Sequence, residues 1–423
     1  MRGDLAFFRE NAPWLLAGLT VSLLSTFGQT AFVAVFSADL STRFDLGPGG
    51  WGTVYAIATM LSAAAMLWAG ALTDRVPLGA LTGWTLVALA GCCIAVAALL
   101  ADTGTAAPGA WALVAAVLGL RLLGQGMLSH IAYVALARWF VARRGQALAI
   151  GVLGFALGQS TLPLGFATAR DVGVPASILW LAAAAVALTS AWPLRRAMDR
   201  VRTPTGTGPA DGPVAGSGPS AHQWTRREAL RTATFWGTMP ALLGTPAFGT
   251  AFFFFQVHLP ETKGWTQVGF VSLFPLIFGV STVSAFATGT LLRHVAARRL
   301  LAPSLLPLAA GFAGMAVAPT LGWAVVPAVA MALSMGAMQV VPTALWAELF
   351  GTRHIGAIKA VAAAVLVLGT ALGPGLVGWW IEAGVPFAAQ MPWIAAYLLL
   401  SAGLAATVLA RPPARPQAER GPT

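Results

Sequence analysis

The sequence predicts an all-α polytopic membrane protein, with twelve transmembrane helices in two pseudo-symmetric six-helix halves. Three observations predict this fold class. First, of the 423 residues 57% are hydrophobic and 9% are charged, with a mean hydropathy of +0.77, whereas soluble domains carry about 25% charged residues. Second, the apolar residues fall into runs of about 20, the length that crosses a hydrocarbon core of ~30 Å. Third, an internal repeat and a central polar segment divide these runs into two sets.

The apolar runs are continuous rather than alternating, which favours helices over a β-barrel. The first run is too long for a signal-peptide core and many others follow it, so we expect it to remain as a span. The twelve predicted spans are 12–37, 51–72, 79–101, 110–136, 146–168, 176–194, 234–258, 267–291, 300–319, 322–347, 356–381 and 389–410.

The basic residues orient these spans. With the N-terminus inside, 21 of the 25 Lys and Arg residues fall on the cytoplasmic side and three (Arg43, Arg170 and Lys263) fall outside, and Arg121 lies within a span. The positive-inside rule therefore places both termini in the cytoplasm. We expect a multi-pass protein of the bacterial inner (cytoplasmic) membrane with the lipid bilayer as its surroundings. The net charge of +11 then reflects topology, and no nucleic-acid partner is expected.

A Gly-, Pro- and Ser-rich stretch, Arg202 to Gln223, has no apolar period and is typical of a flexible linker. The predicted organisation is an N-terminal six-helix half (1–194), a flexible cytoplasmic linker (195–233) and a C-terminal six-helix half with a short cytoplasmic tail (234–423).

The two halves repeat each other. The segment GALTDRVPLGAL (70–81) aligns with GTLLRHVAARRL (289–300), each after the second span of its half. At a spacing of 210 residues Gly126 aligns with Gly336 and Phe140 with Phe350, and a one-residue slip then aligns Gly158 with Gly369. Self-similarity of this kind indicates two structurally equivalent halves.

With two six-helix halves and a short motif after the second span, the sequence resembles the major facilitator superfamily. The motif of that family is approximately G-x-L-x-D-R-x-G-R-R, and the first copy here departs from it after Arg75. The resemblance implies an alternating-access transporter whose loop motif takes part in the conformational cycle. The residues that it assigns to this motif are Gly70, Asp74, Arg75, Gly289, Arg298 and Arg299.

Within that family, ARWFVARRGQALAIG (137–151) and AELFGTRHIGAIKA (347–360) are similar to the monocarboxylate and oxalate/formate porter branch. Oxalate-type members carry basic residues within helices eight and eleven. Here helix eight has none and Lys359 lies near the start of helix eleven, which favours a monoanion over a dianion. The Gly-Pro pair of drug–proton antiporters is replaced in helix five by Gly158-Gln159, which argues against drug efflux without excluding it.

Arg121 is the residue most in need of an explanation. It lies about 15 Å deep in the fourth span, where an arginine costs roughly 2.5–3.5 kcal/mol and needs a partner. No acidic residue lies at that depth, since Asp39, Glu348 and Glu382 are near span ends. We therefore expect an anionic substrate to supply the counter-ion. The alternative is a structural arginine held by backbone carbonyls and polar side chains.

Other polar groups within spans extend this candidate site. Gln125 and Tyr133 follow Arg121 on one slowly drifting helix stripe, and three glutamines lie in helices one, seven and ten. For each glutamine, plain interhelical hydrogen bonding is the alternative. The predicted substrate-binding residues are Arg121, Gln125, Tyr133, Gln29, Gln256 and Gln339.

His258 and His130 are the candidates for protonation or gating, against an interfacial role for His258 and a packing role for His130. Proton coupling and uniport both stay open.

The aromatic run Phe252–Phe255 is expected to be a lipid-facing and packing surface. Glycine pairs four residues apart, such as Gly154 with Gly158, predict close helix packing.

The sequence thus predicts a secondary transporter for a small organic anion, monocarboxylate-like, that functions as a monomer. A drug or metabolite exporter of the same fold is the nearest alternative, and a non-transporting receptor or scaffold is the alternative of another class. No enzyme is expected, because H-E-x-x-H, G-x-S-x-G and nucleotide-binding motifs are absent from the sequence. No cofactor is expected, and no metal, since no metal-ligand spacing occurs.

Overall fold

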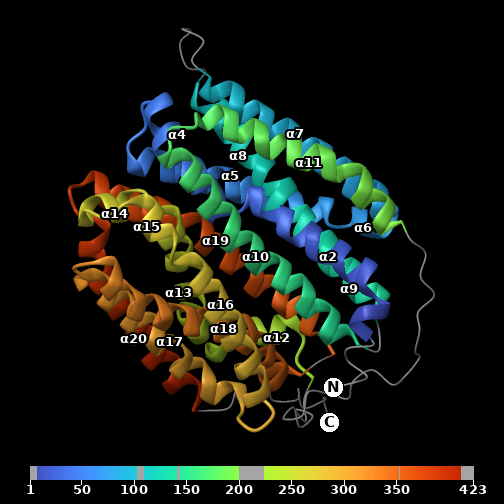
Figure 1. Ribbon diagram of the computed structural model, residues 1–423. Coiled ribbons are helices and arrows are strands. Elements are labelled where there is room, and N and C mark those ends of the chain that lie inside the picture. The colour runs from blue at the N-terminus through green and yellow to red at the C-terminus, as the bar shows by residue number, and fades with distance from the viewer. Residues whose placement is uncertain (1–6, 102–108, 141–142, 200–222, 352, 411–423) are drawn as a thin grey trace, which may run out of the picture. The chain divides into compact units, whose positions relative to one another are not determined.

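A computed structural model describes residues 7–101, 109–140, 143–199, 223–351 and 353–410. Their regular structure is helical, and no strand occurs among these described residues (Figure 1). The helices fall into two compact units, each described by itself. The first comprises Met1–Asp211, Ala251–Phe278 and Pro374–Phe387, and the second comprises Gly212–Thr250, Gly279–Gly373 and Ala388–Thr423.

The first unit contains helices one to six of the predicted set. Its elements are α2 (Ala12–Leu24), η1 (Ser25–Gly28), α3 (Thr30–Val33), η2 (Ala34–Phe36), α4 (Ser37–Arg43), α5 (Pro48–Ala69), α6 (Leu72–Arg75), α7 (Leu78–Leu100), α8 (Ala110–Leu120), η3 (Arg121–Leu128), α9 (Ser129–Trp139), α10 (Arg144–Asp171), α11 (Ala176–Met198), α14 (His258–Lys263) and α15 (Gln267–Val271). Within it α7 packs along α11 and α2 along α10, as Figure 1 shows.

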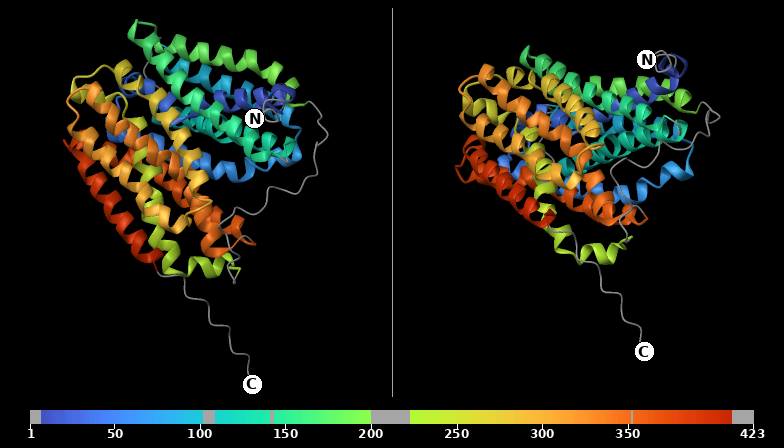
Figure 2. Two further views of the ribbon diagram at one scale, coloured as in Figure 1. Left: turned by 60° about the horizontal axis from the view of Figure 1, so that its bottom comes forward. Right: turned by 90° about the horizontal axis from the view of Figure 1, so that it is seen from below.

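The second unit contains α12 (Arg226–Leu230), α17 (Ala297–Val317) and α18 (Leu321–Phe350), and α17 packs along α18. Four helices contribute residues to both units: α13 (Ala233–Phe254), α16 (Phe274–Leu291), α19 (Ile355–Glu382) and α20 (Phe387–Leu409). The course of the long helices can be followed in the two further views of Figure 2.

Among the described residues, ten helices are long and apolar enough to span a membrane, and the bent pair Ala12–Gly28 and Thr30–Arg43 makes an eleventh. The remaining predicted span, α13, has 22 residues, about 33 Å at the α-helical rise. Its many Gly, Thr and Pro residues lower its hydropathy. The predicted class, an all-α polytopic fold, is confirmed.

Many large apolar side chains lie on the outside of these helices. Leu67 is 77% exposed, Trp68 and Trp111 are each 73% exposed, and Val317 is 78% exposed. Apolar surface of this extent is not tolerated by a monomeric soluble protein. It is the surface that helices present to lipid, so the protein is a multi-pass membrane protein.

Glycines allow the predicted close approach of helices in both units. A Cβ at Gly158 of α10 would overlap Thr26 Oγ1 and lie 2.6 Å from the Leu23 carbonyl oxygen. In the second unit, a Cβ at Gly373 of α19 would lie 3.0 Å from the Ala247 Cα in α13. Only glycine fits at such contacts. Helices five and one of the first half therefore pack in the same manner as the equivalent helices eleven and seven.

The segment predicted as the linker, 195–233, contains helix near both of its ends. α11 continues to Met198, and α12 begins after a capping box in which Thr225 and Glu228 bond each other's backbone N–H groups. Trp224 is buried, with its ring 5.7 Å from that of Phe350. These local hydrogen bonds and this buried ring order the segment before α13. Residues 200–222 lie outside the described part of the chain.

The expectation that Phe252–Phe255 faces lipid is wrong, and the expectation that it is a packing surface is confirmed. The four side chains are between 1% and 7% exposed. Phe253 stacks on Phe278 with centroids 5.4 Å apart, and Phe254 stacks on Trp51 at 5.5 Å. The four rings point to different neighbours because consecutive helical residues differ by about 100°, and each direction is occupied by protein.

Candidate functional site

Three irregular stretches of helix lie together in the first unit. Helix one breaks at Gln29, whose φ of −84° and ψ of 153° are extended, and the chain bends there by 48°. Helix four is π-helical across η3, which begins at Arg121. Helix seven is interrupted by the turn Phe255–Val257 between α13 and α14. Breaks of this kind leave backbone N–H and C=O groups without the hydrogen bonds that a regular helix would give them.

The first two stretches touch through their backbones. A Cβ at Gly28 would overlap the Leu120 carbonyl oxygen and lie 2.7 Å from the Gly124 Cα. Gly124 meets Gly28 in the same way, because a Cβ there would lie 2.6 Å from the Gly28 Cα. Two facing glycines therefore let the end of η1 lie directly against the π-helical turn. This contact brings Arg121, at the start of η3, beside the break.

Arg121 is held at this contact by groups that carry no charge. Its Nη1 donates to Thr30 Oγ1 at 3.2 Å and to the Gly28 carbonyl oxygen at 3.5 Å. Its guanidinium carbon lies 5.0 Å from the centroid of the Tyr55 ring, and the Tyr55 and Thr30 hydroxyls hydrogen-bond each other at 2.5 Å. The Arg121 side chain is almost fully buried, with the residue 3% exposed.

Gln256 binds the same broken stretch from helix seven. Its Nε2 donates to the Ala31 carbonyl oxygen at 2.7 Å, and the residue is fully buried. Phe254, two residues earlier, packs with its ring 4.7 Å from the ring of Tyr55. The carbonyls and the hydroxyl of Gly28–Ala31 therefore receive side-chain donors from helices four and seven.

Three polar atoms around this contact are buried without a hydrogen-bond partner among the described residues: Arg121 Nε, Gln125 Oε1 and Gln256 Oε1. Buried polar atoms are nearly always paired in folded proteins. A small polar ligand would therefore satisfy one unpaired donor and two unpaired amide oxygens. The Gln125 oxygen is exchangeable with its amide nitrogen by a flip of the side chain, whereas a flip of Gln256 would break its hydrogen bond to Ala31.

Two carboxylates near the ends of the predicted spans pair with arginines other than Arg121. Asp39 pairs with Arg170 at 2.5 Å. In the part of the chain that the structure describes, no carboxylate lies within ion-pair distance of Arg121. The buried positive charge is thus solvated by neutral groups only.

Glu382, at the end of α19, closes the N-terminus of α5. Its Oε1 accepts hydrogen bonds from the backbone N–H groups of Gly49 at 3.0 Å and Gly50 at 3.1 Å. One turn away, Trp379 Nε1 donates to Thr53 Oγ1 at 3.1 Å. A carboxylate at a helix N-terminus satisfies orphan donors and interacts favourably with the helix dipole.

The other predicted binding residues occupy different places. Gln29 is buried at the break itself. Tyr133 is twelve residues beyond Arg121, about 18 Å along the helix, and its ring packs 3.0 Å from where a Gly151 Cβ would be. Gln339 belongs to the second unit, where its Nε2 donates to Ser281 Oγ at 3.1 Å. The structure therefore brings Arg121, Gln125, Gln29 and Gln256 to one region of the first unit, with Tyr133 outside it.

Neither candidate histidine contacts Arg121. His130 Nε2 lies 3.5 Å from Thr73 Oγ1, beside the loop after α5. His258 begins α14, with its ring 6.3 Å from that of Phe255, and its Nε2 has no partner among the described residues.

Thr30, Tyr55 and Gly28 complete the surroundings of Arg121, and none of the three is among the predicted site residues. Tyr55 carried a usable signal, because it is one of only three tyrosines in the chain and lies within a predicted span. Gly28 could not have been selected from the sequence, since it is one of 47 glycines.

The loop motif forms ion pairs in both units. In the first, Arg138 pairs with Asp74 and donates to the Thr73 carbonyl oxygen at 2.8 Å. In the second, Arg298 Nε lies 3.2 Å from Glu348 Oε1. Arg138 and Glu348 are 210 residues apart, so they are equivalent in the repeat and carry opposite charges.

The remaining motif residues make fewer contacts. Arg75 and Arg299 are exposed. A Cβ at Gly70 would lie 3.0 Å from the Met66 carbonyl oxygen, whereas one at Gly289 would meet no atom within 4 Å. A Cβ at the first glycine would therefore make a tight contact in this structure, and one at the second would not.

Comparison with solved structures shows the same fold. A bacterial homologue of the human lysosomal transporter Spinster, in an inward-facing and unoccupied conformation, is 15% identical with a TM-score of 0.69, covering 95% of this chain and 97% of that one. A D-xylose–proton symporter is 14% identical with a TM-score of 0.67, covering 93% and 96%.

No protein of curated function matches this sequence. The sequence profile of the Major Facilitator Superfamily matches residues 18–374, which is most of the chain and includes both copies of the loop motif. The chain belongs to the Major Facilitator Superfamily and is, as a member, a membrane transporter rather than an enzyme.

Proposed function

We propose that this protein is a secondary transporter that moves a small organic anion, monocarboxylate-like, across the cytoplasmic membrane by alternating access. The observation that carries the proposal is Arg121, a buried cation whose partners are all neutral. Its Nε is left without a hydrogen-bond partner among the described residues.

Neutral partners reduce the cost of burying a guanidinium but do not cancel its charge. A carbonyl, a hydroxyl and an aromatic ring each contribute a partial negative charge, whereas a carboxylate contributes a full one and can take two N–H groups of the guanidinium at once. A bound monoanion at Nε would leave the site close to neutral. A dianion would leave an excess negative charge in a region without a second cation, which supports a singly charged substrate.

The breaks in helices one and seven support a binding role for this region. In secondary transporters, substrates bind near the bilayer midplane, where interrupted helices expose backbone groups. Here the break in helix one receives Arg121 from the π-helical turn and Gln256 from the break in helix seven, and Gln125 and Gln256 have unpaired amide oxygens. A flip of the Gln125 amide would turn a donor toward the second carboxylate oxygen, whereas Gln256 keeps its orientation because its Nε2 donates to the Ala31 carbonyl oxygen.

Ligand-induced thermal stabilisation of the purified protein tests the proposal. Small monocarboxylates, dicarboxylates, lipophilic cations and sugars are screened against wild type, Arg121→Ala and a control, Arg293→Ala, which removes an exposed arginine of the loop before α17. A ligand at 100 times its Kd stabilises the native state by about 2.7 kcal/mol. We expect a monocarboxylate to raise the melting temperature of wild type and control, and to leave that of Arg121→Ala unchanged.

The same proteins are then reconstituted into liposomes for flux measurements with the ligand that stabilises. Uptake by the wild type and by Arg293→Ala, and none by a folded Arg121→Ala, is expected. Stabilisation by cations alone, or equal stabilisation of all three proteins by the anion, would contradict the proposal and favour an exporter. Binding without flux would favour a receptor.

A further inference from the structure

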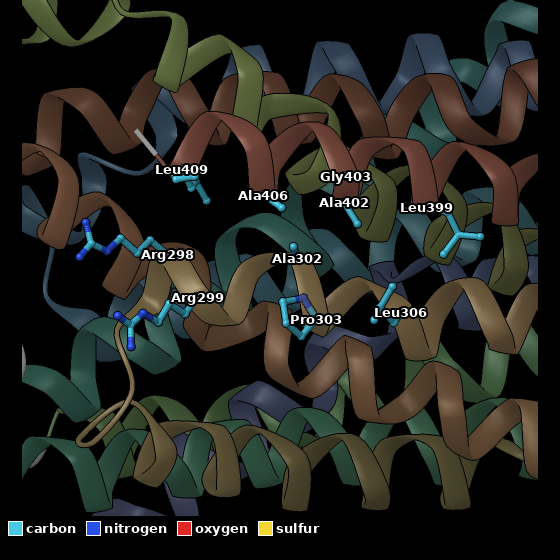
Figure 3. A pocket seen from close by; sticks show the side chains of 11 residues that line it. Arg298, Arg299, Ala302, Pro303, Leu306, Leu399, Ala402, Gly403, Ala406 and Leu409 are labelled. Atoms are coloured by element: carbon cyan, nitrogen blue, oxygen red, sulfur yellow. The ribbon is translucent and has the colours of Figure 1, made fainter. Parts of the chain in front are cut away.

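A groove in the second unit lies apart from the candidate site. It runs between α17 and α20, has a volume of about 720 Å³ and is lined by residues of these two helices and by Ala410, which follows α20. Figure 3 shows Arg298 and Arg299 together at one end, and small and aliphatic side chains along the rest. The groove is therefore charged at one end and apolar along its length.

Small residues hollow this groove. Ala302 of α17 faces Ala402, Gly403 and Ala406 of α20 across it, whereas ordinary helix packing would place larger side chains there. A Cβ at Gly403 would meet no atom within 4 Å. The space is thus open to the outside, and both flanking helices are candidate membrane spans.

Both arginines keep terminal guanidinium donors for which the described residues supply no hydrogen bond. Arg298 contacts Glu348 through Nε, so its terminal guanidinium nitrogens take no part in that ion pair. Arg299 is exposed at the start of α17, and no ion pair of it occurs among the described residues. Guanidinium groups bind phosphate oxygens through pairs of N–H groups, so two of them at one end of the groove can hold a phosphate.

The length of the groove matches one leaflet of a bilayer. Along α17 it extends from Arg298 to Leu306 and along α20 from Leu399 to Leu409, about 12 Å and 15 Å at the α-helical rise. Half of a ~30 Å hydrocarbon core is about 15 Å. An acyl chain that starts at the arginines would therefore lie in the groove down to the midplane.

We propose that this groove is a binding site for one anionic glycerophospholipid. The phosphate binds the terminal nitrogens of Arg298 and Arg299, and an acyl chain fills the channel between Ala302 and Gly403. Glu348 lies within ion-pair distance of Arg298 Nε and accepts from the Arg298 backbone N–H, so the lipid headgroup and Glu348 bind the same arginine at different nitrogens. The site thus connects lipid binding to an ion pair of the loop motif.

Two other occupants fit less well. Free phosphate would use the arginines and leave the apolar channel empty. A helix of a second copy would contact two or three turns along the groove, which is short of the ~1,000 Å² that a stable protein interface needs.

Native mass spectrometry of delipidated protein tests the proposal. Phosphatidylglycerol and phosphatidylcholine with identical acyl chains are titrated separately, and soluble glycerol phosphate is added as a competitor. The variants are Arg299→Gln, Arg298→Gln/Arg299→Gln and Gly403→Leu. Gly91→Leu in α7 is the matched control, because Gly91 is exposed and its Cβ would also meet no atom within 4 Å.

We expect one phosphatidylglycerol to bind more tightly than phosphatidylcholine, with about a fivefold loss of affinity in Arg299→Gln and about thirtyfold in the double variant. Gly403→Leu should abolish binding of both lipids, and Gly91→Leu should not. Equal affinity in wild type and all variants, displacement by glycerol phosphate, or a dimer in place of a lipid adduct would each overturn the proposal. The melting temperature of each variant without lipid identifies any that fails to fold.

Discussion

Arg121 owes its position to residues that are ordinary in themselves. Thr30 Oγ1 and the Gly28 carbonyl oxygen accept from the guanidinium, and the Tyr55 ring covers it at 5.0 Å. Each contact is modest on its own, since a hydrogen bond that involves a charged group contributes about 1.5–3 kcal/mol net. Together they keep the cation in place while leaving its Nε for a ligand, which is the property that the proposed transport function uses.

The two contributions of Tyr55 can be separated. Tyr55→Phe removes the hydroxyl that bonds Thr30 but keeps the ring over Arg121, so we expect a loss of about 1 kcal/mol in stability. Tyr55→Leu also removes the cation–π contact and should cost up to ~2 kcal/mol more in this desolvated place. Melting temperatures in detergent should therefore fall in the order wild type, Tyr55→Phe, Tyr55→Leu. Equal melting temperatures for the two variants would show that the ring does not stabilise the arginine.

At the residue scale, the polarity of side chains within spans identified candidate site residues. Their positions relative to one another could not be predicted. Arg121, Gln125 and Gln256 could be selected because polar side chains in apolar spans are costly and need partners. Their convergence could not be derived, because the Ala31 carbonyl accepts from Gln256 across 225 residues of chain. Thr30 could not be ranked, since a threonine hydroxyl is commonly satisfied by a carbonyl of its own helix. Thr53, whose Oγ1 donates to the Gly49 carbonyl oxygen, shows this alternative in the same helix as Tyr55.

At the scale of secondary-structure elements, the breaks within helices do more to position the candidate site than the regular helices do. Apolar runs predict where a span lies, and its length follows from the bilayer, but a break needs one residue to leave helical dihedrals. Gln29 does so in an extended conformation that any residue can adopt, so the break cannot be predicted from residue type. The π-helical turn in helix four is equally hard to predict from residue types, although it contains Gly124 and Gly126, which permit it.

The contact between the two breaks predicts a sharp effect of one methyl group. Gly28→Ala would place a Cβ onto the Leu120 carbonyl oxygen, a backbone atom that cannot move without shifting η3. We expect this variant to be destabilised by several times the ~1 kcal/mol that alanine normally gains over glycine in a helix. Gly91→Ala in α7 has open space and should be neutral or slightly stabilising. Thermal unfolding of both purified proteins checks this, and equal melting temperatures would contradict the packing of η1 on η3.

At the scale of the whole molecule, the internal repeat accounts for most of what could be foreseen. It predicted equivalent helices, and the close packing of α10 on α2 and of α19 on α13 has the same glycine basis in both units. It did not predict the reversal of charge between Arg138 and Glu348. The halves keep an ion pair near the same loop with the signs exchanged, because a pair is stable in either polarity. The proposed division into halves at 194 and 234 stays a prediction.

The arrangement of basic residues predicts that both termini lie in the cytoplasm. Cys92 and Cys93 are replaced by alanine, and a single cysteine is then placed at either terminus or at Lys263, on the predicted outer side. In intact cells, a membrane-impermeant thiol reagent should label Lys263→Cys and neither terminal cysteine. In inside-out vesicles the pattern should reverse. Labelling of one terminus only in intact cells would mean an odd number of spans.

The hydrogen bonds of Glu382 to Gly49 and Gly50 have a consequence for biosynthesis. The acceptor lies 332 residues after Gly50, and a ribosome that adds 5–20 residues per second needs about 17–66 s to make that length of chain. Throughout this interval the N-terminus of α5 is without its final partner, so water must solvate its N–H groups. Synthesis of nearly the entire chain thus precedes the completion of its second helix.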